Sequence, residues 1–336
     1  MDLIYADANR VEIGVLQIYE LDLAFGSSEN DFELRVALSS HCCQAGYYIY
    51  IDRTEYGGII DAVEVDTENN EVIYSGRTWH GILNSRIIEP ASGDSHYIVN
   101  NDAQAALVTL IYQIGLSGLF YVPQMYAGCQ ISNYKMDRYI TAYDGIRKML
   151  GKYGAKLCLT YDASLASVVT EVVQSSDLFR HTEDCLSSDL LDFQVKRTIS
   201  AGKTNHLVCL GSGEMADRMV VHLYADAAGN ISQTQTITDL DEYEAVFDFP
   251  NAESEEDLIA YGTERFEELL QQDKLSVSFT DEADDIFDVG DIVGATESVT
   301  GISVTVPITK KIVNIKSGEL SVSYQTDAEQ AEVEYQ

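Results

Sequence analysis

The sequence predicts a β-rich α+β protein in which two β-rich parts flank a small α/β module. Three observations support this class. The first ninety residues contain short runs of alternating apolar and polar residues, such as VEIGVLQI, FELRVAL and EVIYSGR. Apolar residues at helical spacing replace them between positions 101 and 150, and alternating runs such as KLSVSF and ELSVSY return towards the carboxyl end. A period of two is typical of strands with one buried face, whereas a period near 3.6 indicates helices.

The amino-terminal part reads as repeated short strands with tight turns, which is typical of a barrel or a sandwich. Residues 56–77 predict a hairpin of two long strands joined at Glu68, Asn69 and Asn70, because asparagine tolerates left-handed turn conformations. The following string WHGILNSRIIEP indicates a helical turn and then an edge strand that ends at Pro90.

The middle of the chain predicts two helices. The first is expected over residues 105–114, after a cap at Asn100 or Asn101, and the second over residues 142–150, after a cap at Thr141. The strings KLCLTYD and SVVTEVVQ then read as strands. Together these elements predict the α/β module.

The remainder predicts a second β-rich part with one helix over residues 254–270. Ser254 and Asp257 resemble a capping box at the start of this helix. Near the carboxyl end, Pro307 indicates that the strand containing it is an edge strand or a bulged strand. The expected domains are a first β-rich domain, the α/β module, a second β-rich domain and a polar tail, at residues 1–90, 91–187, 188–326 and 327–336.

The charge of the chain is strongly negative. Its 55 acidic and 21 basic residues give a formal net charge of −34, which opposes binding to a polyanion such as DNA. Residues 239–291 hold 19 acids against two bases, Arg265 and Lys274, for a net −17. A solvated acidic face that aids solubility and a surface that repels DNA both explain this stretch, and a cation-binding patch is a third reading.

The sequence indicates no membrane span and no signal peptide, since no window approaches 18 consecutive apolar residues and no basic segment precedes an apolar one at the amino terminus. Its six cysteines are dispersed without a Cys-x-x-Cys spacing. We therefore expect free, buried thiols in a reducing cytosol.

Two motifs invite a chemical reading. His41, Cys42 and Cys43 offer zinc ligands or a nucleophile, but adjacent side chains of an extended segment point in opposite directions. The string LGSGEMADR resembles a phosphate-binding loop, but it lacks a third glycine and a lysine, so we expect a turn or a bulge between paired strands at residues 211–217. The acidic string DEADDIFD lacks the spacing of an EF-hand loop.

Enzyme signatures are equally weak. The sequence contains no GxSxG, HExxH or Walker motif, and with 55 acids no particular carboxylate pair stands out. The tyrosines Tyr47, Tyr48, Tyr50 and Tyr56 suit sugar stacking or an interface, although ordinary strand packing explains them as well. We predict a protein that is not an enzyme, with no catalytic, cofactor-binding or metal-binding residues and no cofactor.

A family resemblance rests on the order of several segments along nearly the whole chain: YELDLAFGSSENDFELRV, GYYIYIDRTEYGGIIDAVEVD, GRTWHGILNSRIIEP, RYITAYDGIRKMLGKYGAKLCLTYD, TNHLVCLGSGEMADR and VGDIVGA. In this order they resemble the siphophage tail-hub family. These are baseplate-hub-like minor tail proteins related to the amino-terminal regions of tail-associated lysins and to late control D proteins.

The resemblance implies two tube- or hub-like β-barrel domains with the α/β insert between them. Residues 57–60 would belong to a strand of the first barrel and residues 290–293 to a strand of the second, while Gly76, Arg77 and Trp79 precede the closing turn of the first. The family carries no shared catalytic set, and we expect no lysin activity because no room remains after Gln336 for a peptidoglycan-cleaving domain.

The implied function is that of a structural tail-tip or baseplate hub of a phage, a prophage or a phage-tail-like particle. Three copies would form a ring that adapts a hexameric tail tube to the tip or spike. The expected partners are further copies of the chain, a distal tail or tail tube protein, a tape measure protein, and spike or receptor-binding fibre proteins. DNA would pass through the ring without specific binding.

The implied location is the virion tail, assembled in the cytoplasm of the bacterial host. Acidic side chains such as Asp281, Asp284 and Asp285 would line the bore and repel DNA. The alternatives are a carbohydrate-binding, adhesin-like module, which predicts a shallow aromatic cleft, and a carboxylate-dependent hydrolase, which predicts a deep pocket with perturbed carboxylates or thiols.

Overall fold

The computed structural model describes residues 1–90, 93, 96–176, 193–198, 204–213, 215–250, 252, 254–270, 274–279, 287–297, 302–316, 318–326 and 332–335. The chain forms two compact units: unit 1 comprises residues 1–194 and 277–336, and unit 2 comprises residues 195–276. Cys185, Asp281, Asp284 and Asp285 lie outside the described residues.

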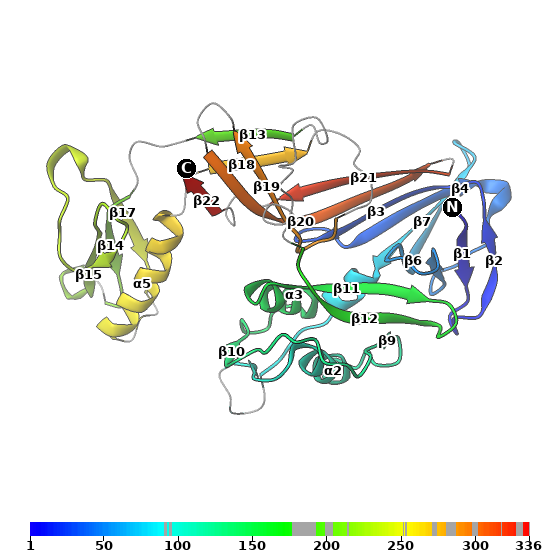
Figure 1. The fold of residues 1–336 in the computed structure, drawn as a ribbon, viewed down its shortest axis with the longest axis horizontal. Helices are drawn as coiled ribbons and strands as arrows, with labels where there is room; N and C mark the ends of the chain where they lie inside the picture. The colour runs from blue at the N-terminus through cyan, green and yellow to red at the C-terminus, as the bar shows by residue number, and fades with distance from the viewer. Residues whose placement is uncertain are drawn as a thin grey trace. The chain divides into compact units, whose positions relative to one another are not determined.

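Most of unit 1 is one large sheet with the strand order β13-β18-β21-β20-β3-β4-β7-β6-β5-β1-β2, in which β13 and β18 cross the boundary between the units, and β19 and β22 also pair with β20 (Figure 1). Its amino-terminal strands are β1 Leu3–Ala6, β2 Glu12–Leu16, β3 Glu20–Gly26, β4 Asp31–Ala37, β5 Tyr48–Tyr50, β6 Gly57–Asp66 and β7 Glu71–Thr78. Its later strands are β13 Phe193–Thr198, β18 Lys274–Phe279, β19 Ile292–Glu297, β20 Ile302–Lys316, β21 Glu319–Thr326 and β22 Glu332–Tyr335.

The strand β20 joins the two ends of the chain. Its first half pairs with β19 and β22, and its second half pairs with β21 and β3, placing Ile315 opposite Leu21. The pairing with β21 shifts register between Ile308 and Lys310, directly after Pro307. The bulged strand expected at Pro307 is therefore confirmed, because proline lacks the amide hydrogen that a regular ladder needs.

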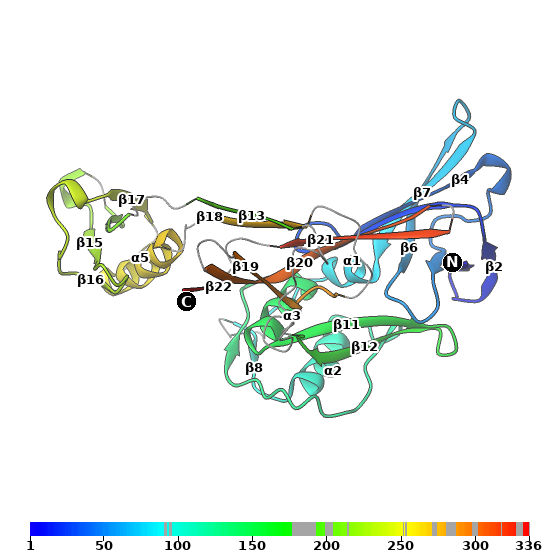
Figure 2. The same ribbon diagram turned by 45° about the horizontal axis from the view of Figure 1, so that its top comes forward.

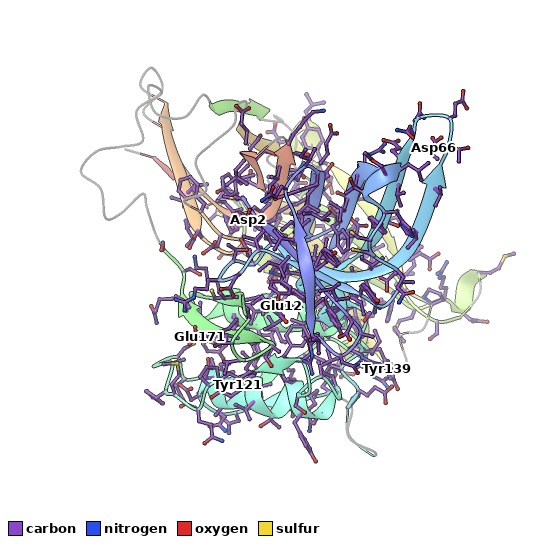
Figure 3. The ribbon with its side chains drawn as sticks, turned by 90° about the vertical axis from the view of Figure 1, so that its right-hand side faces the viewer. Asp2, Glu12, Asp66, Tyr121, Tyr139 and Glu171 are labelled. Carbon is purple, nitrogen blue, oxygen red and sulfur yellow. The ribbon has the colours of Figure 1, made fainter. Side chains whose placement is uncertain are left out.

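The predicted hairpin is confirmed as β6 and β7, and it extends past the neighbouring strands in Figure 2. Asp66 closes its tip by accepting hydrogen bonds from the amides of Glu68 and Asn69, and Asn70 takes a left-handed φ of 58°. Figure 3 shows Asp66 at this tip. Short polar side chains therefore make the turn that the sequence predicts.

The α/β module of unit 1 contains three helices and short sheets. Its helices are α1 Trp79–Asn84, α2 Ala103–Gln113 and α3 Ala142–Lys152, and its strands are β8 Ile98–Val99, β9 Phe120–Tyr121, β10 Tyr134–Lys135, β11 Ala155–Asp162 and β12 Ser167–Gln174. The two predicted helices and the strands expected at KLCLTYD and SVVTEVVQ are confirmed, and Thr141 caps α3 by accepting from the Asp144 amide. The edge strand expected before Pro90 is wrong, since that segment makes only an isolated bridge between Ile87 and Thr141. The cap of α2 is Asp102, not Asn100 or Asn101.

Two hydrophobic clusters fill unit 1. One lies beneath the large sheet and contains Leu23, Phe25, Tyr74 and Val313. The other joins the α/β module to the sheet strands, where the buried Trp79 ring stacks on Tyr161 at a centroid distance of 5.1 Å. The single tryptophan of the chain is thus part of the core.

Unit 2 consists of a four-stranded sheet and one long helix. The sheet order is β16-β15-β14-β17, with β14 His206–Leu210, β15 Val220–Ala225, β16 Ile231–Ser232 and β17 Glu244–Asp248, and the helix is α5 Glu255–Leu270. Leu258 and Phe266 of α5 are buried against Leu207, Cys209 and Leu223. The helix expected over residues 254–270 is confirmed, and Ser254 accepts a hydrogen bond from the Asp257 amide at its start.

The β-rich fold is confirmed, whereas the two closed barrels are not. Among the described residues the strand path runs from β13 to β2, and no pairing joins these two ends. Alternating residues indicate which face of a strand is buried, but they do not indicate whether the outer strands of a sheet meet. The expected domain boundaries at residues 90, 187 and 326 stay predictions.

Candidate functional surfaces

The conspicuous cluster of His41, Cys42 and Cys43 packs around one tyrosine. The Tyr74 hydroxyl lies 2.8 Å from His41 Nδ1, and it accepts hydrogen bonds from the amides of Cys42 and Cys43. Burial raises the pKa of the Cys43 thiol, and the neighbouring Cys42 raises it further. A raised pKa disfavours the nucleophilic thiolate, so this arrangement suits packing better than catalysis.

The other sequence motifs also have structural positions. Residues 211–213 and 215–217 lie between the antiparallel strands β14 and β15, which agrees with the connection between paired strands expected there, while Glu214 lies outside the described residues. Of the four clustered tyrosines, Tyr50 and Tyr56 are buried and Tyr47 and Tyr48 are half-buried. They form no exposed aromatic platform of the kind that a sugar-binding module uses.

One face of the large sheet is acidic. A hollow in this face is lined by Asp22, Glu29, Asp31, Glu33 and Asp61. Asp22, Asp31 and Glu33 come from β3 and β4, whose leucines point to the opposite, buried face, while Asp61 comes from β6 and Glu29 from the turn between β3 and β4. Strand alternation therefore places the carboxylates together on the uncovered side.

The cations on this face are already paired with carboxylates. Arg77 binds Asp61 at 2.8 Å, and Lys310 Nζ lies 2.5 Å from Glu29. Within the described part of the chain, Asp22 and Asp31 form no ion pair. The face therefore keeps a net negative charge.

Two like charges lie directly opposite each other at the centre of this face. Asp22 of β3 is in register with Glu33 of β4. Partial burial raises the pKa of Asp22, and repulsion from Glu33, Glu29 and Asp31 raises it further. Arg35 contacts Glu33 at 2.6 Å and offsets part of this repulsion, while Asp22 has no such partner among the described residues. Like charges across an antiparallel pair destabilise a sheet, so the remaining repulsion is unfavourable for folding.

A second surface is the apolar edge formed by β2. This strand is one end of the sheet path and pairs only with β1 among the described strands. Ile13 and Val15 of β2 are each 50% exposed, Val11 just before the strand is 61% exposed, and Ile18 just after it is 85% exposed. Soluble proteins usually protect an edge strand with charges or proline, so an apolar edge indicates a contact surface. Figure 3 views unit 1 from this side, with Glu12 of β2 labelled.

A buried charge network ties β11 to the carboxyl-terminal strands. The Lys156 ammonium is 8% exposed and lies 2.6 Å from Asp288 and 2.7 Å from Asp291. Lys311, 1% exposed, binds Glu55 at 2.7 Å. Burial alone lowers the pKa of Lys156, but hydrogen bonds to the two aspartates outweigh this effect and the pKa is raised.

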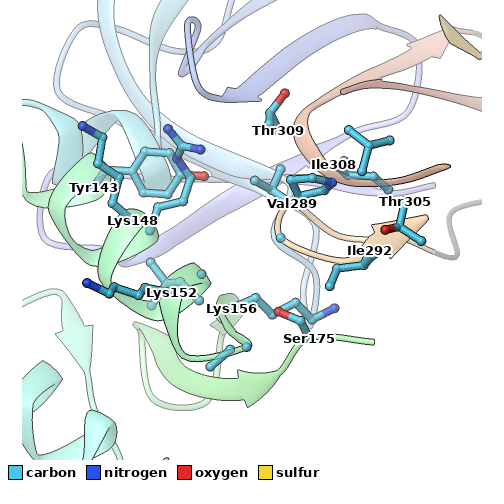
Figure 4. Close-up of a pocket in the computed structure, with 18 residues that line it drawn as sticks. Tyr143, Lys148, Lys152, Lys156, Ser175, Val289, Ile292, Thr305, Ile308 and Thr309 are labelled. Carbon is cyan, nitrogen blue, oxygen red and sulfur yellow. The ribbon is translucent and has the colours of Figure 1, made fainter. Parts of the chain in front are cut away.

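A cavity of about 340 Å³ lies between α3, β11 and the start of β20 (Figure 4). Lys148 and Lys152 lie on its α3 side, and Val289, Ile292 and Ile308 line the opposite side. None of the described residues that line it carries a carboxylate, an imidazole or a thiol. The cavity therefore does not supply the carboxylate pair or activated thiol that the hydrolase alternative requires.

Within the described ranges, none of the helices is both long and apolar enough to span a lipid bilayer.

The fold has counterparts among solved structures. A 43 kDa tail protein of prophage MuSo2 from Shewanella oneidensis superimposes with a TM-score of 0.52 and 10% identity, over 98% of this chain and 99% of that chain. The chain has the fold of a prophage tail protein. This similarity confirms, for the fold, the tail-protein resemblance seen in the sequence.

Two further structures match with lower scores. A tail protein from Neisseria meningitidis MC58 gives a TM-score of 0.49 at 10% identity over 98% and 97% of the two chains. A prophage tail protein, gp18, from Listeria monocytogenes EGD-e gives 0.47 at 11% identity over 98% and 95%. No family model and no curated protein sequence matches the chain.

Sequence reasoning missed both surfaces as sites. The string VEIGVLQI carries the signal for the apolar edge, because its apolar residues exceed what one buried face needs. The acidic hollow has no local signal, since its carboxylates come from three separate strands and a turn.

Proposed function

We propose that this chain is a structural tail-tip or baseplate hub that assembles as a trimeric ring in a phage, prophage or phage-tail-like particle. The observation that carries the proposal is the fold shared with a prophage tail protein over almost the full length of both chains. The ring would join a hexameric tail tube to the tip and would contact distal tail, tape measure and spike or fibre proteins. We propose a structural role without catalysis.

The two surfaces give this proposal a physical basis. The exposed apolar edge of β2 would be buried between copies of the chain, which removes its unpaired strand edge from water. The acidic sheet face would line the bore. Its carboxylates repel the phosphates of DNA, so that DNA passes without being held. This use explains why Asp22 and Glu33 remain opposite each other despite their repulsion.

The first experiment is light scattering of the purified chain over a range of concentrations. A trimer of a 37.2 kDa chain has a mass of about 112 kDa. We expect the mass to approach this value as concentration rises. A mass of 37.2 kDa at every concentration would contradict self-assembly of the isolated chain.

A pair of variants links the assembly to β2. Ile13→Lys and Val15→Lys each place a charge in the apolar edge. Each substitution should lower the association constant of the trimer at least tenfold. Val65→Lys is the matched control, because Val65 is 52% exposed but lies in the β6–β7 hairpin. Equal effects of all three substitutions would exclude β2 as the contact between copies.

A further inference from the structure

Unit 2 carries a cluster of histidines and carboxylates on the face of its sheet that α5 does not cover. His206 begins β14, His222 lies in the adjacent strand β15, and Glu244 begins β17. Leu207, Cys209 and Leu223 alternate with the two histidines and point to the helix-covered core. Because successive side chains of a strand point to opposite faces, the cluster lies outside that core.

The strand register brings the side chains together. His206 is paired with Glu244 across the parallel ladder, and Glu242 stands two residues before Glu244, so it projects from the same face. His206 Nδ1 lies 2.8 Å from Glu242 Oε1 and 2.9 Å from Glu244 Oε1. These three atoms all lie within 4.8 Å of one another.

The cluster is enclosed on the side of His206 and Glu242, whereas the Glu244 side chain is 63% exposed and leaves it open to solvent. The His206 ring is 5% exposed although it lies on the uncovered face, because Tyr224 stacks on it at a centroid distance of 4.4 Å. The Glu242 side chain is 23% exposed. The ring of His206 is already fixed against two carboxylates, so binding an ion would cost little further side-chain conformational entropy.

We propose that His206, Glu242 and Glu244 bind a divalent transition-metal ion of the Zn²⁺ type. One imidazole nitrogen and two carboxylate oxygens suit Zn²⁺, and the two carboxylates balance its charge. Tetrahedral Zn²⁺ with bonds near 2.1 Å needs ligand atoms about 3.4 Å apart, so the carboxylates must open by about half an ångström. The fourth position would hold water. The ion replaces the proton on Nδ1, which is released to solvent.

The surrounding hydrogen bonds fit a metal site. His206 Nε2 lies 2.8 Å from His222 Nδ1, so the metal-bound form of His206 donates its Nε2 proton to His222. Such a donation from the second ring nitrogen fixes the orientation of a metal-bound histidine. Gln235 donates from Nε2 to Glu242 Oε1 at 2.7 Å and orients that carboxylate.

The ion would tie together segments that the chain separates by more than thirty residues. It links the start of β14 to the start of β17 and to Glu242, which follows the turn η3 Asp239–Asp241. Asp239 in this turn has a left-handed φ of 63°, which costs free energy in a residue other than glycine. A metal ion held by Glu242 would stabilise that turn.

The test is Zn²⁺ binding to the full-length, metal-stripped chain at pH 7, followed by calorimetry and by X-ray absorption at the zinc edge. We expect one site per chain with nitrogen and oxygen ligands only, and an increase in the melting temperature of unit 2. Sulfur ligands would instead assign the ion to Cys42 and Cys43 and would overturn the proposal. Failure to bind Zn²⁺ below 100 µM would also overturn it.

Two substitutions at the cluster and two controls locate the site. Glu244→Gln removes a ligand whose side chain is 63% exposed and should weaken Zn²⁺ binding at least tenfold while the apo protein melts as before. His222→Ala removes only the hydrogen-bond acceptor and should weaken binding roughly tenfold. Glu256→Gln on α5 and His41→Ala in unit 1 are the matched controls and should leave affinity unchanged. Loss of binding in either control, or unchanged affinity in Glu244→Gln, would exclude the proposed ligands.

Discussion

At the scale of single residues, two buried lysines hold unit 1 together across long sequence distances. Lys156 of β11 contacts Asp288 and Asp291, while Lys311 of β20 contacts Glu55. Asp291 also accepts hydrogen bonds from the amides of Ser176 and Asp288, so its charge is well compensated. Removal of one partner from such a group leaves a buried charge without compensation. The free-energy cost of that uncompensated charge is larger than the net stabilisation that the intact pair provides.

We therefore expect Lys156→Met to lower the free energy of unfolding of unit 1 by about 3 kcal/mol. The control is Lys316→Met, because Lys316 is 71% exposed and its pair with Glu20 is screened by water, so its loss should change stability by less than about 0.5 kcal/mol. Urea denaturation at pH 7 measures both values. Similar losses in the two variants would contradict the role given to burial.

A second prediction concerns His80, which stacks on Phe25 at 4.3 Å and is buried. Burial, and then the nearby Lys311, lowers the pKa of His80 to about 3. The folded state thus holds His80 neutral while the unfolded state protonates below about pH 6.5. The contribution of neutral His80 to the free energy of unfolding therefore has its full value above pH 6.5 and decreases as the pH falls from there towards 3.

His80→Phe should remove this dependence. Between pH 6 and 5 the slope of unfolding free energy against pH should decrease by about 1.4 kcal/mol per pH unit relative to the parent chain. Urea titrations at several pH values measure the slope. An unchanged slope would mean that His80 does not titrate between the folded and unfolded states.

At the scale of elements, β3 and β4 combine a well-packed inner face with an outer face that repels itself. Leu21, Leu23 and Leu34 are buried beneath them, while Asp22 and Glu33 oppose each other above. The hydrophobic burial of the inner face outweighs the repulsion of the outer one. A sheet that keeps such a pair is better suited to present negative charge than to maximise stability.

Asp22→Asn should consequently stabilise unit 1 by roughly 0.5 kcal/mol in low salt. The gain should shrink as salt is added, because salt screens the repulsion in the parent chain. Glu20→Gln is the matched control on the same strand face: Glu20 lies opposite Arg35 and binds Lys316, so its neutralisation should not stabilise. A destabilised Asp22→Asn variant would contradict the repulsion argument.

At the scale of the whole molecule, the two units have separate hydrophobic cores. The core of unit 2 is formed by β14, β15, α5 and their neighbours, and it includes Leu207, Leu258 and Phe266. The cores of unit 1 draw their residues from the rest of the chain. Each unit thus buries the apolar surface that cooperative folding requires.

We expect two thermal transitions in the full-length chain. Phe266→Ala, which creates a cavity in unit 2, should lower the transition of unit 2 with a cost of about 3 to 5 kcal/mol and leave the other transition in place. Leu23→Ala should have the reverse effect. Calorimetric scans of the two variants provide the measurement, and a single transition that shifts in both would contradict independent folding.

Local chemistry explains which predictions succeeded. The hairpin turn at Asn70, the cap at Thr141 and the bulge after Pro307 each depend on the residue itself and its near neighbours. The cap of α2 shows the limit of such reasoning. Asn100, Asn101 and Asp102 can all cap a helix, and Asp102 is selected because its carboxylate also accepts from the distant Ala127 amide. A choice among equivalent neighbours is made by tertiary contacts.

By itself, the sequence determined the β-rich class, the type of each confirmed helix and strand, the face that each strand buries, and the resemblance to tail proteins. Only the tertiary structure decided that β20 pairs with β3, that Asp22 faces Glu33, that Lys156 lies between two aspartates, and that His206 meets Glu242 and Glu244. The physical reason is that alternation records burial one strand at a time. Strand pairing is made by backbone groups that are alike at every residue, so the neighbour of a strand follows from the packing of the whole unit.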